Sequence, residues 1–300
     1  MFKIKHPVMK ILCLASLFFS QWVSAADLLV DTDWLAKHKQ NKDVVLIDMS
    51  SDYTQYQRFH IPGATYLDYG NLITYRKKDK VAFSIDDKQL YRLLGLLGIN
   101  EKSHIVIYDD MGGLNAGRFY WNLERIGHEK ISIVDGGLVK WILEGRPVDN
   151  KEVTPVKTIY TPNQKTINNN ATLAELVSLS ANDKTHLLDV RSREEYLGDK
   201  KHPRTSGHIP GARFWPWEEN VDFSNGFILK DDQTIQHVLN DLSIKNKDDS
   251  LILYCRSGHR AAQSYLSLRK LGYNNVKIYD GSMAEYTLRK ILPIQQGITP

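Results

Sequence analysis

The chain has 300 residues, of which 42% are hydrophobic and 25% are charged. This composition is typical of globular proteins, and the length is sufficient for two domains of ordinary size. A formal net charge of +4, from 39 basic and 35 acidic residues, is too small to indicate nucleic-acid binding or electrostatic attachment to a membrane surface.

The first 26 residues have the pattern of a secretory signal peptide. Three lysines precede an apolar run over 11–23, and Val23-Ser24-Ala25-Ala26 supplies small residues for cleavage. Because the run is short for a membrane span, we expect export to a bacterial periplasm, with no stable membrane insertion after cleavage. An uncleaved N-terminal anchor is the alternative. Without residues 1–26 the chain keeps 36 basic and 35 acidic residues, and Cys255 is its only cysteine.

The remaining sequence contains an internal repeat. The matching segments are 44–48 and 186–191, 60–64 and 207–212, 105–109 and 251–255, and 131–137 and 276–281. We therefore predict two copies of one domain, at 27–150 and 171–300, joined by a polar linker over 151–170.

In each copy, short aliphatic runs alternate with helical stretches such as 87–97, 118–126 and 234–242. This alternation predicts an α/β fold, with a mainly parallel sheet flanked by helices.

Cys255 lies where a predicted strand passes into a predicted helix. A loop at that point directs backbone N–H groups inward, and the positive end of the helix adds to their field. The basic side chains of Arg256, His259 and Arg260 are expected to strengthen this field, so we expect a reactive thiolate near neutral pH. The alternative is an inert buried cysteine, which does not account for the basic loop around it.

The length of the loop indicates which group it binds. Four residues separate Cys255 from Arg260, and Ala261 excludes the five-residue spacing of Cys-dependent phosphatases. The tighter ring of amides is better suited to one extra sulfur on the cysteine, a persulfide, stabilised by the loop residues Arg256, Ser257, Gly258, His259 and Arg260. In the first copy Asp109 replaces the cysteine, so we expect that copy to be an inactive structural half.

These residues resemble a known family. The loop 255–260 resembles the active loop of rhodanese sulfurtransferases, and Asp135-Gly136-Gly137 with Trp141 resembles the first half of their tandem-domain members. The resemblance covers roughly 28–292. It implies two tandem rhodanese-like domains, an inactive first and a catalytic second, with Cys255 as the catalytic residue.

The resemblance also implies roles for residues outside the loop. Arg204 matches an arginine that binds a substrate carboxylate in the mercaptopyruvate branch, and Arg193 is a second candidate for substrate binding. Ser257 stands where the thiosulfate branch has lysine. Glu195 stands where tandem members have arginine, so its carboxylate is expected to repel an anionic donor.

Three further residues are expected to support the site. Asp189 and Arg191 are expected to form a buried ion pair at the end of a strand. His208, in the motif over 207–212, is expected to hydrogen-bond backbone rather than substrate.

The function implied is transfer of a sulfane sulfur from thiosulfate, 3-mercaptopyruvate or a related donor to a thiol or cyanide acceptor through a Cys255 persulfide. No metal and no organic cofactor is implied, and no protein partner is predicted. Two alternatives stay open. One is a non-catalytic sulfur carrier or binding module, and the other is a Cys-dependent phosphatase or arsenate-handling enzyme.

Overall fold

A computed structural model describes residues 26–162, 165–179, 184–198 and 206–300. The predicted leader therefore lies outside the described residues except for Ala26, and Arg204 also lies outside them. Within the described part, no helix has both the length and the apolar character that crossing a membrane requires.

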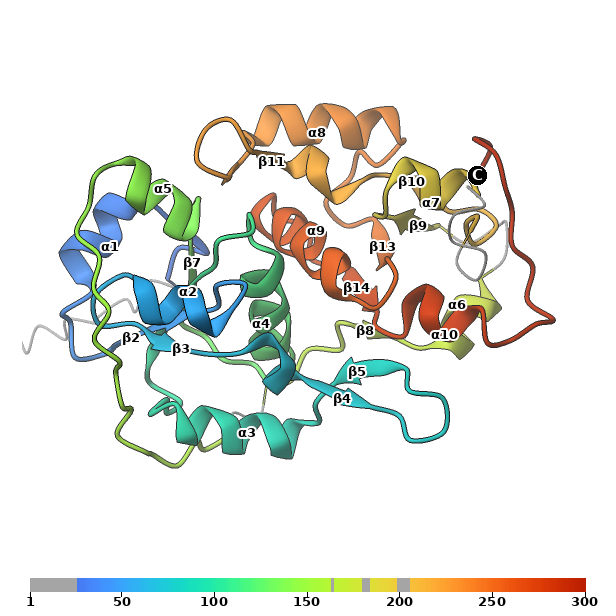
Figure 1. The fold of residues 1–300 in the computed structure, drawn as a ribbon. Coiled ribbons are helices and arrows are strands. Elements are labelled where there is room, and N and C mark those ends of the chain that lie inside the picture. Colours follow the sequence, from blue (N-terminus) through green and yellow to red (C-terminus); the bar gives the residue numbers. More distant parts are fainter. Residues whose placement is uncertain (1–25, 163–164, 180–183, 199–205) are drawn as a thin grey trace, which may run out of the picture.

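The chain forms two five-stranded sheets with the same topology, and all neighbouring strands are parallel (Figure 1). The first sheet has the order β1-β7-β6-β2-β3 and the second β8-β14-β13-β9-β10. The strands of the first sheet are β1 (Leu29–Val30), β2 (Val44–Asp48), β3 (Thr65–Tyr66), β6 (His104–Tyr108) and β7 (Ile131–Val134). Those of the second are β8 (Asn170–Ala171), β9 (Thr185–Asp189), β10 (Arg213–Phe214), β13 (Ser250–Tyr254) and β14 (Val276–Tyr279).

Each sheet also has a small antiparallel hairpin beside it. The hairpins pair β4 (Ile73–Tyr75) with β5 (Ala82–Ser84), and β11 (Val221–Asp222) with β12 (Ile228–Leu229). The repeat seen in the sequence is therefore a repeat of structure, and the predicted α/β fold with mainly parallel sheets is confirmed.

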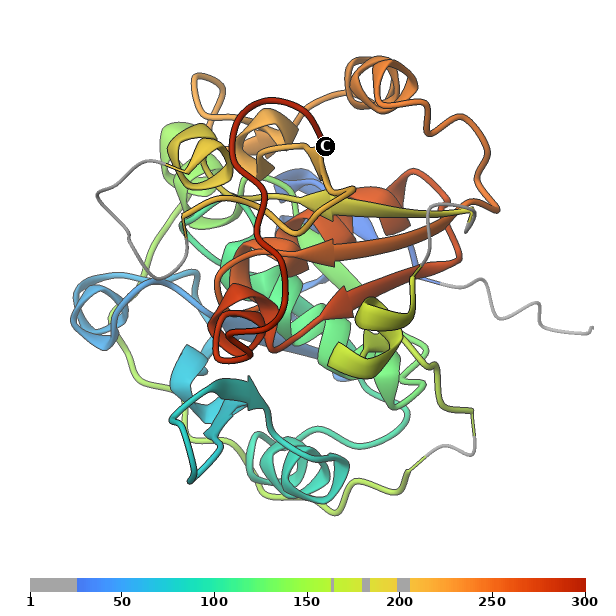
Figure 2. The same cartoon turned by 90° about the vertical axis from the view of Figure 1, so that its right-hand side faces the viewer.

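Helices cover the sheets and connect their strands (Figures 1 and 2). In the first domain they are α1 (Thr32–His38), α2 (Tyr53–Arg58), the 3₁₀ helix η1 (Tyr69–Leu72), α3 (Asp87–Leu96), α4 (Leu114–Arg125) and α5 (Gly137–Leu143). In the second they are α6 (Leu173–Ser178), α7 (Arg193–Leu197), η2 (Trp217–Asn220), α8 (Asp232–Asp241), α9 (His259–Lys270) and α10 (Ser282–Tyr286).

Helix α4 begins four residues earlier than the predicted stretch 118–126. The segment 112–117 contains three glycines and resembles a turn in sequence. In the structure Gly113 takes φ +89° as the N-cap, and this conformation lets the helix begin directly after it.

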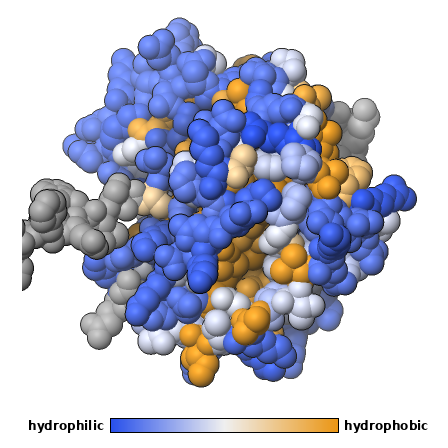
Figure 3. Space-filling model, turned by 90° about the vertical axis from the view of Figure 1, so that its left-hand side faces the viewer, coloured by the Kyte–Doolittle hydropathy of each residue, from blue (hydrophilic) through white to orange (hydrophobic). Residues whose placement is uncertain are grey.

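The two domains pack through α4 and α9, which lie side by side at the centre of the molecule (Figure 1). Their backbones are close: a Cβ at Gly117 would lie 2.7 Å from the Ala262 carbonyl oxygen. The face of the molecule drawn in Figure 3 is mostly hydrophilic, with apolar residues gathered in a hollow in its lower half.

The repeated Asp-Gly after β7 and β14 forms a pair of related contacts across the interface. Asp280 accepts the backbone N–H of Ser84, at the end of β5, at 2.7 Å. Asp135 accepts the backbone N–H of Leu229, at the end of β12, at 2.8 Å. Each domain thus uses the same motif to bind the hairpin of the other.

The predicted linker is attached to the first domain. Trp121 donates its indole N–H to the Asn169 carbonyl at 3.0 Å, and the Asn169 side chain donates back to the Trp121 carbonyl at 3.0 Å. Tyr160 is buried and stacks on Tyr91 at 5.6 Å between ring centroids. The segment between the domains therefore takes part in holding them together.

Candidate active site at the domain interface

Cys255 follows the central strand β13, where the chain leaves the carboxyl edge of the second sheet. It is a free cysteine and is 1% exposed. Helix α9 begins four residues later at His259, after Gly258, whose φ is +78°. The strand-to-helix transition predicted for this residue is therefore present, and the positive end of a twelve-residue helix lies beside it.

The first residue of α10, Ser282, holds the loop in place through hydrogen bonds. The hydroxyl of Ser282 accepts the backbone N–H groups of Cys255 and Gly258, each at 3.1 Å. The same hydroxyl donates to the Tyr279 carbonyl at 2.8 Å, which fixes its orientation. Neither of these two amides is thus available to a substrate.

The other amides of the loop have no such acceptor. Among the described residues, no acceptor binds the backbone N–H groups of Arg256, Ser257, His259 and Arg260. These groups follow Cys255 directly, in the loop and at the start of α9. They can therefore stabilise an anion attached to the Cys255 sulfur.

The corresponding loop of the first domain shows the same kind of amide ring with an anion in it. The Asp109 carboxylate accepts four backbone N–H groups, from Met111 and Gly113 at 3.0 Å, Asn115 at 2.9 Å and Ala116 at 3.0 Å. Burial raises the pKa of Asp109 above its ordinary value, and the hydrogen bonds from the backbone amides act against this rise because they favour the ionised form.

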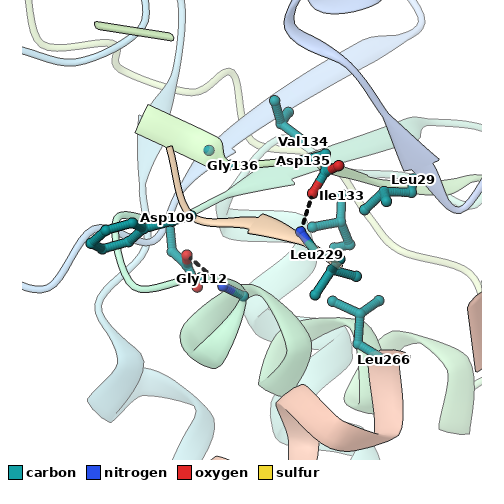
Figure 4. Close-up of a pocket in the computed structure, with 12 residues that line it drawn as sticks. Leu29, Asp109, Gly112, Ile133, Val134, Asp135, Gly136, Leu229 and Leu266 are labelled. Carbon is teal, nitrogen blue, oxygen red and sulfur yellow. Dashed lines mark hydrogen bonds between the residues drawn. The ribbon is translucent and has the colours of Figure 1, made fainter. Parts of the chain in front are cut away.

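The first-domain loop has no space for a substrate. The cavity beside Asp109 has a volume of only about 10 Å³ and is lined on the side of the second domain by Phe227, Leu229 and Leu266 (Figure 4). That volume is at the limit for a single water molecule. Domain packing therefore excludes a sulfur donor from the first copy, in addition to the missing cysteine.

The first domain nevertheless contributes side chains to the Cys255 site. Arg118, from α4, forms an ion pair with Asp280 at 2.6 Å, and the two side chains are only 1% and 5% exposed. Both Arg118 and Tyr69, from η1, lie within electrostatic range of the Cys255 sulfur. Sequence reasoning missed these residues, because their position depends on how the domains pack. The one available signal was an arginine directly after the glycine-rich turn.

His259 is uncharged. Burial, together with the charges of Arg118 and Arg260, lowers the pKa of His259 to about 4. Its Nε2 lies 2.8 Å from the Asn115 Oδ1, while the Asn115 amide nitrogen donates to the Met49 carbonyl at 2.8 Å. This arrangement assigns the proton of His259 to Nε2. The expectation that His259 adds positive charge to the loop was therefore wrong.

Arg260 binds Glu195 through two hydrogen bonds, of 2.6 Å and 3.0 Å. Burial alone would raise the pKa of Glu195, but the hydrogen bond and charge of Arg260 outweigh it and lower the pKa. The expectation of a free carboxylate that repels the donor was thus wrong, because Arg260 neutralises it.

The predicted supporting residues lie at the end of β9 and in the segment that follows α7. Asp189 and Arg191 form a fully buried ion pair at 2.5 Å, and Arg191 also donates to the Gly207 carbonyl at 2.7 Å. His208 lies 3.0 Å from each of two backbone carbonyls, those of Tyr196 and Thr299. These contacts connect the end of β9 with the C-terminal segment.

The two substrate-binding candidates are placed differently. Arg193 is the exposed first residue of α7, two positions before Glu195. Arg204 lies outside the described residues. Arg256, in the loop itself, is exposed.

Comparison with known proteins decides the family. The model of the rhodanese-like domain matches residues 31–144 and 172–289, one range in each predicted copy. The chain belongs to the rhodanese family. Two tandem rhodanese-like domains, as the sequence predicts, are thereby confirmed.

Relatives of this rhodanese span most of its length. A Mycobacterium bovis protein named "Putative thiosulfate sulfurtransferase 1" is 33% identical over 285 residues, which cover 92% of this chain and 100% of the relative. The "Sulfur carrier protein TtuD" of Thermus thermophilus is 29% identical over 288 residues, 90% and 97% of the two chains. The crystal structure of SseA from Escherichia coli, described among 3-mercaptopyruvate sulfotransferases, superposes with a TM-score of 0.73 at 26% identity, over 86% and 98%.

The ion pair between Glu195 and Arg260 makes the stability of this rhodanese depend on pH. Because the folded-state pKa of Glu195 is lowered, the stabilisation is complete above the unfolded value of about 4.3 and disappears as pH falls through the folded value. Glu195→Gln keeps the capping position of α7 and is expected to lower the free energy of unfolding by about 1–3 kcal/mol at pH 7.

Urea unfolding of Glu195→Gln and the wild type from pH 7 to pH 3 measures this effect. The difference between the two proteins should shrink below about pH 4. A difference that stays constant with pH would contradict the assignment.

Proposed function

We propose that this rhodanese is a sulfurtransferase, which carries a sulfane sulfur on Cys255 from a small donor to a thiol or cyanide. The observation that carries the proposal is the contrast between the two loops. The first-domain loop holds the Asp109 carboxylate with four amides, whereas four amides around the buried thiol of Cys255 lack an acceptor among the described residues. An extra sulfur at the S–S distance of about 2 Å from that thiol supplies the anion the loop is shaped to hold.

The chemistry consists of two displacements. The Cys255 thiolate attacks the outer sulfur of thiosulfate, 3-mercaptopyruvate or a polysulfide, and the leaving group departs with its bonding electron pair as sulfite, an enolate or a thiolate. The loop amides then stabilise the terminal sulfur of the persulfide. An acceptor thiolate or cyanide attacks that sulfur and releases the Cys255 thiolate. Each displacement forms one bond to the transferred sulfur as another breaks, with the electron pair of the broken bond going to the departing group, so the two steps together need no oxidant or reductant.

Intact mass spectrometry tests the proposal. After incubation with thiosulfate or 3-mercaptopyruvate, the wild-type protein should gain the mass of one sulfur, and this gain should disappear when an acceptor thiol or cyanide is added. Cys255→Ser should show no gain and a loss of turnover of at least about a thousandfold. Turnover retained by Cys255→Ser would refute the proposal, and the faster donor identifies the substrate branch.

A sulfur carrier is the second candidate, favoured by the 29% identity to the sulfur carrier protein TtuD. A carrier predicts one equivalent of persulfide with no sustained release to small acceptors. A Cys-dependent phosphatase would instead hydrolyse an aryl phosphate and gain no sulfur. The loop of four residues between Cys255 and Arg260 argues against the phosphatase.

We also propose that residues 1–26 direct export to the periplasm. The support is the lysine-rich start, the apolar run and the small residues before Asp27. The intact mass of the protein recovered from cells should correspond to a chain that begins near residue 26 or 27.

A further inference from the structure

Tyr69 of the first domain lies over the active loop of the second. It is the first residue of η1, directly after Asp68, whose carboxylate accepts the backbone N–H of Gly70 at 2.6 Å. The ring of Tyr69 packs on the imidazole of His259, with 4.3 Å between ring centroids and a tilt of 38°. The phenol of one domain thus covers the first residue of the helix that follows Cys255.

His259 gives this packing a fixed position. Its imidazole is bound to Asn115 of the first domain at 2.8 Å, and Asn115 is held in turn by the Met49 carbonyl at 2.8 Å. Asn115 and Met49 of the first domain therefore fix the position of the His259 ring, on which the Tyr69 ring packs.

The hydroxyl group of Tyr69 differs in its hydrogen bonding from the other tyrosine hydroxyls near the two loops. The hydroxyl makes no hydrogen bond to any described residue. By contrast, the hydroxyls of Tyr108 and Tyr254, which precede Asp109 and Cys255, each accept a backbone N–H at 3.1 Å. Tyr69 is half-buried, and its hydroxyl oxygen is not fully enclosed by the protein.

Tyr69 lies within electrostatic range of Cys255, and Arg118 acts on both groups. Burial raises the pKa of Tyr69 to about 12; the charge of Arg118 acts against this rise, whereas Cys255 and Asp280 add to it. Tyr69 therefore remains protonated at neutral pH and can act only as a neutral donor or acceptor of hydrogen bonds. Arg118 and Asp280 are already bound to each other at 2.6 Å.

We propose that Tyr69 is a catalytic residue of the second domain's site, whose hydroxyl donates a hydrogen bond to the transferable sulfur on Cys255. This inference rests on the proposed sulfur transfer. The loop amides stabilise the terminal sulfur from the side of α9, and Tyr69 stabilises it from the side of the first domain. The S–S bond to Cys255 forms as the bond to the leaving group breaks, and Tyr69 keeps its proton throughout.

A donor aimed at developing charge acts mainly in the transition state. Removing it should therefore slow the chemical step more than it weakens donor binding. Tyr69→Phe keeps the ring on His259 and removes only the hydroxyl, whereas Tyr69→Leu removes both. Tyr75→Phe, at a residue 63% exposed in the β4–β5 hairpin, is the matched control.

The test measures the rate of sulfur loading by rapid quench and intact mass, over a range of thiosulfate and 3-mercaptopyruvate concentrations. We expect Tyr69→Phe to lose about tenfold or more in the limiting rate, with the half-saturating donor concentration changed less than threefold. Tyr75→Phe should match the wild type.

Each outcome has one meaning. If wild-type Cys255 gains no sulfur, the proposed function fails and this inference fails with it. If the wild type loads normally and Tyr69→Phe loads within twofold of it, only the inference about the hydroxyl is overturned. A slow Tyr69→Leu beside a normal Tyr69→Phe would show that Tyr69 acts by ring packing alone and would also overturn the inference.

Discussion

Gly258→Ala is expected to lower the rate of sulfur transfer by at least about a hundredfold and the free energy of unfolding by about 2–5 kcal/mol. The added Cβ would lie 2.5 Å from the Asp280 Oδ1 and 2.7 Å from the Arg118 Nη1. The backbone φ of +78° at Gly258 adds strain for any residue with a Cβ. The loop must then shift, and its amides leave the positions around the Cys255 sulfur.

Gly272 is the control, because an alanine there would introduce backbone strain without a steric clash. Gly272, just beyond the other end of α9, has φ +86°, and nothing lies within 4 Å of the position that an added Cβ would take there. Gly272→Ala should cost only about 1–2 kcal/mol of stability and leave the transfer rate unchanged. Equal losses of activity in the two variants, measured by sulfur loading and urea unfolding, would contradict the steric explanation.

Arg118→Met is expected to lower the free energy of unfolding by about 3–5 kcal/mol. It leaves the Asp280 carboxylate, 5% exposed, in the domain interface with the Ser84 backbone N–H as a remaining donor at 2.7 Å. An unpaired buried charge costs far more than the net contribution of the pair itself. Urea unfolding of the two proteins measures the difference.

A second substitution, at Asp280, tests whether the unpaired carboxylate causes the loss. Arg118→Met combined with Asp280→Asn removes the buried charge and should recover a large part of the lost stability. Arg146→Met is the control, because its partners Asp33 and Glu144 are 70% and 31% exposed, and it should change stability by at most about 1 kcal/mol. A loss in Arg118→Met as small as that of the control would show that the Asp280 charge is not confined to the interface.

The two copies have diverged in what fills their amide rings. In the first domain the ring is satisfied permanently by Asp109, and second-domain side chains close the cavity beside it. Under the proposed function, the ring of the second domain is left to a sulfur that enters and leaves. A carboxylate that is part of the chain cannot be exchanged, so the first copy can stabilise the fold but cannot carry a transferable group.

Much of the fold and part of the site could be predicted from the sequence. The duplicated motifs, the short aliphatic runs that alternate with helical stretches, and the rhodanese resemblance of the loop are local patterns. They determine the two α/β domains and the position of Cys255, because strand and helix periodicity and a strand-to-helix loop depend on neighbouring residues. The Asp189–Arg191 pair was also within reach, since its two residues are adjacent to the same strand end.

Only the tertiary structure decided what surrounds the sulfur. Tyr69 and Asn115 contact His259, and Arg118 acts electrostatically on Cys255, from more than a hundred positions away in the sequence. No pattern along the chain indicates these contacts. The charges at the site also depend on tertiary packing: Arg260 neutralises Glu195, and burial makes His259 neutral. Pairing and desolvation are properties of a packed interior, so the sequence by itself determined that Cys255 follows a strand and precedes a helix, and the packing of the two domains determined the environment of its sulfur.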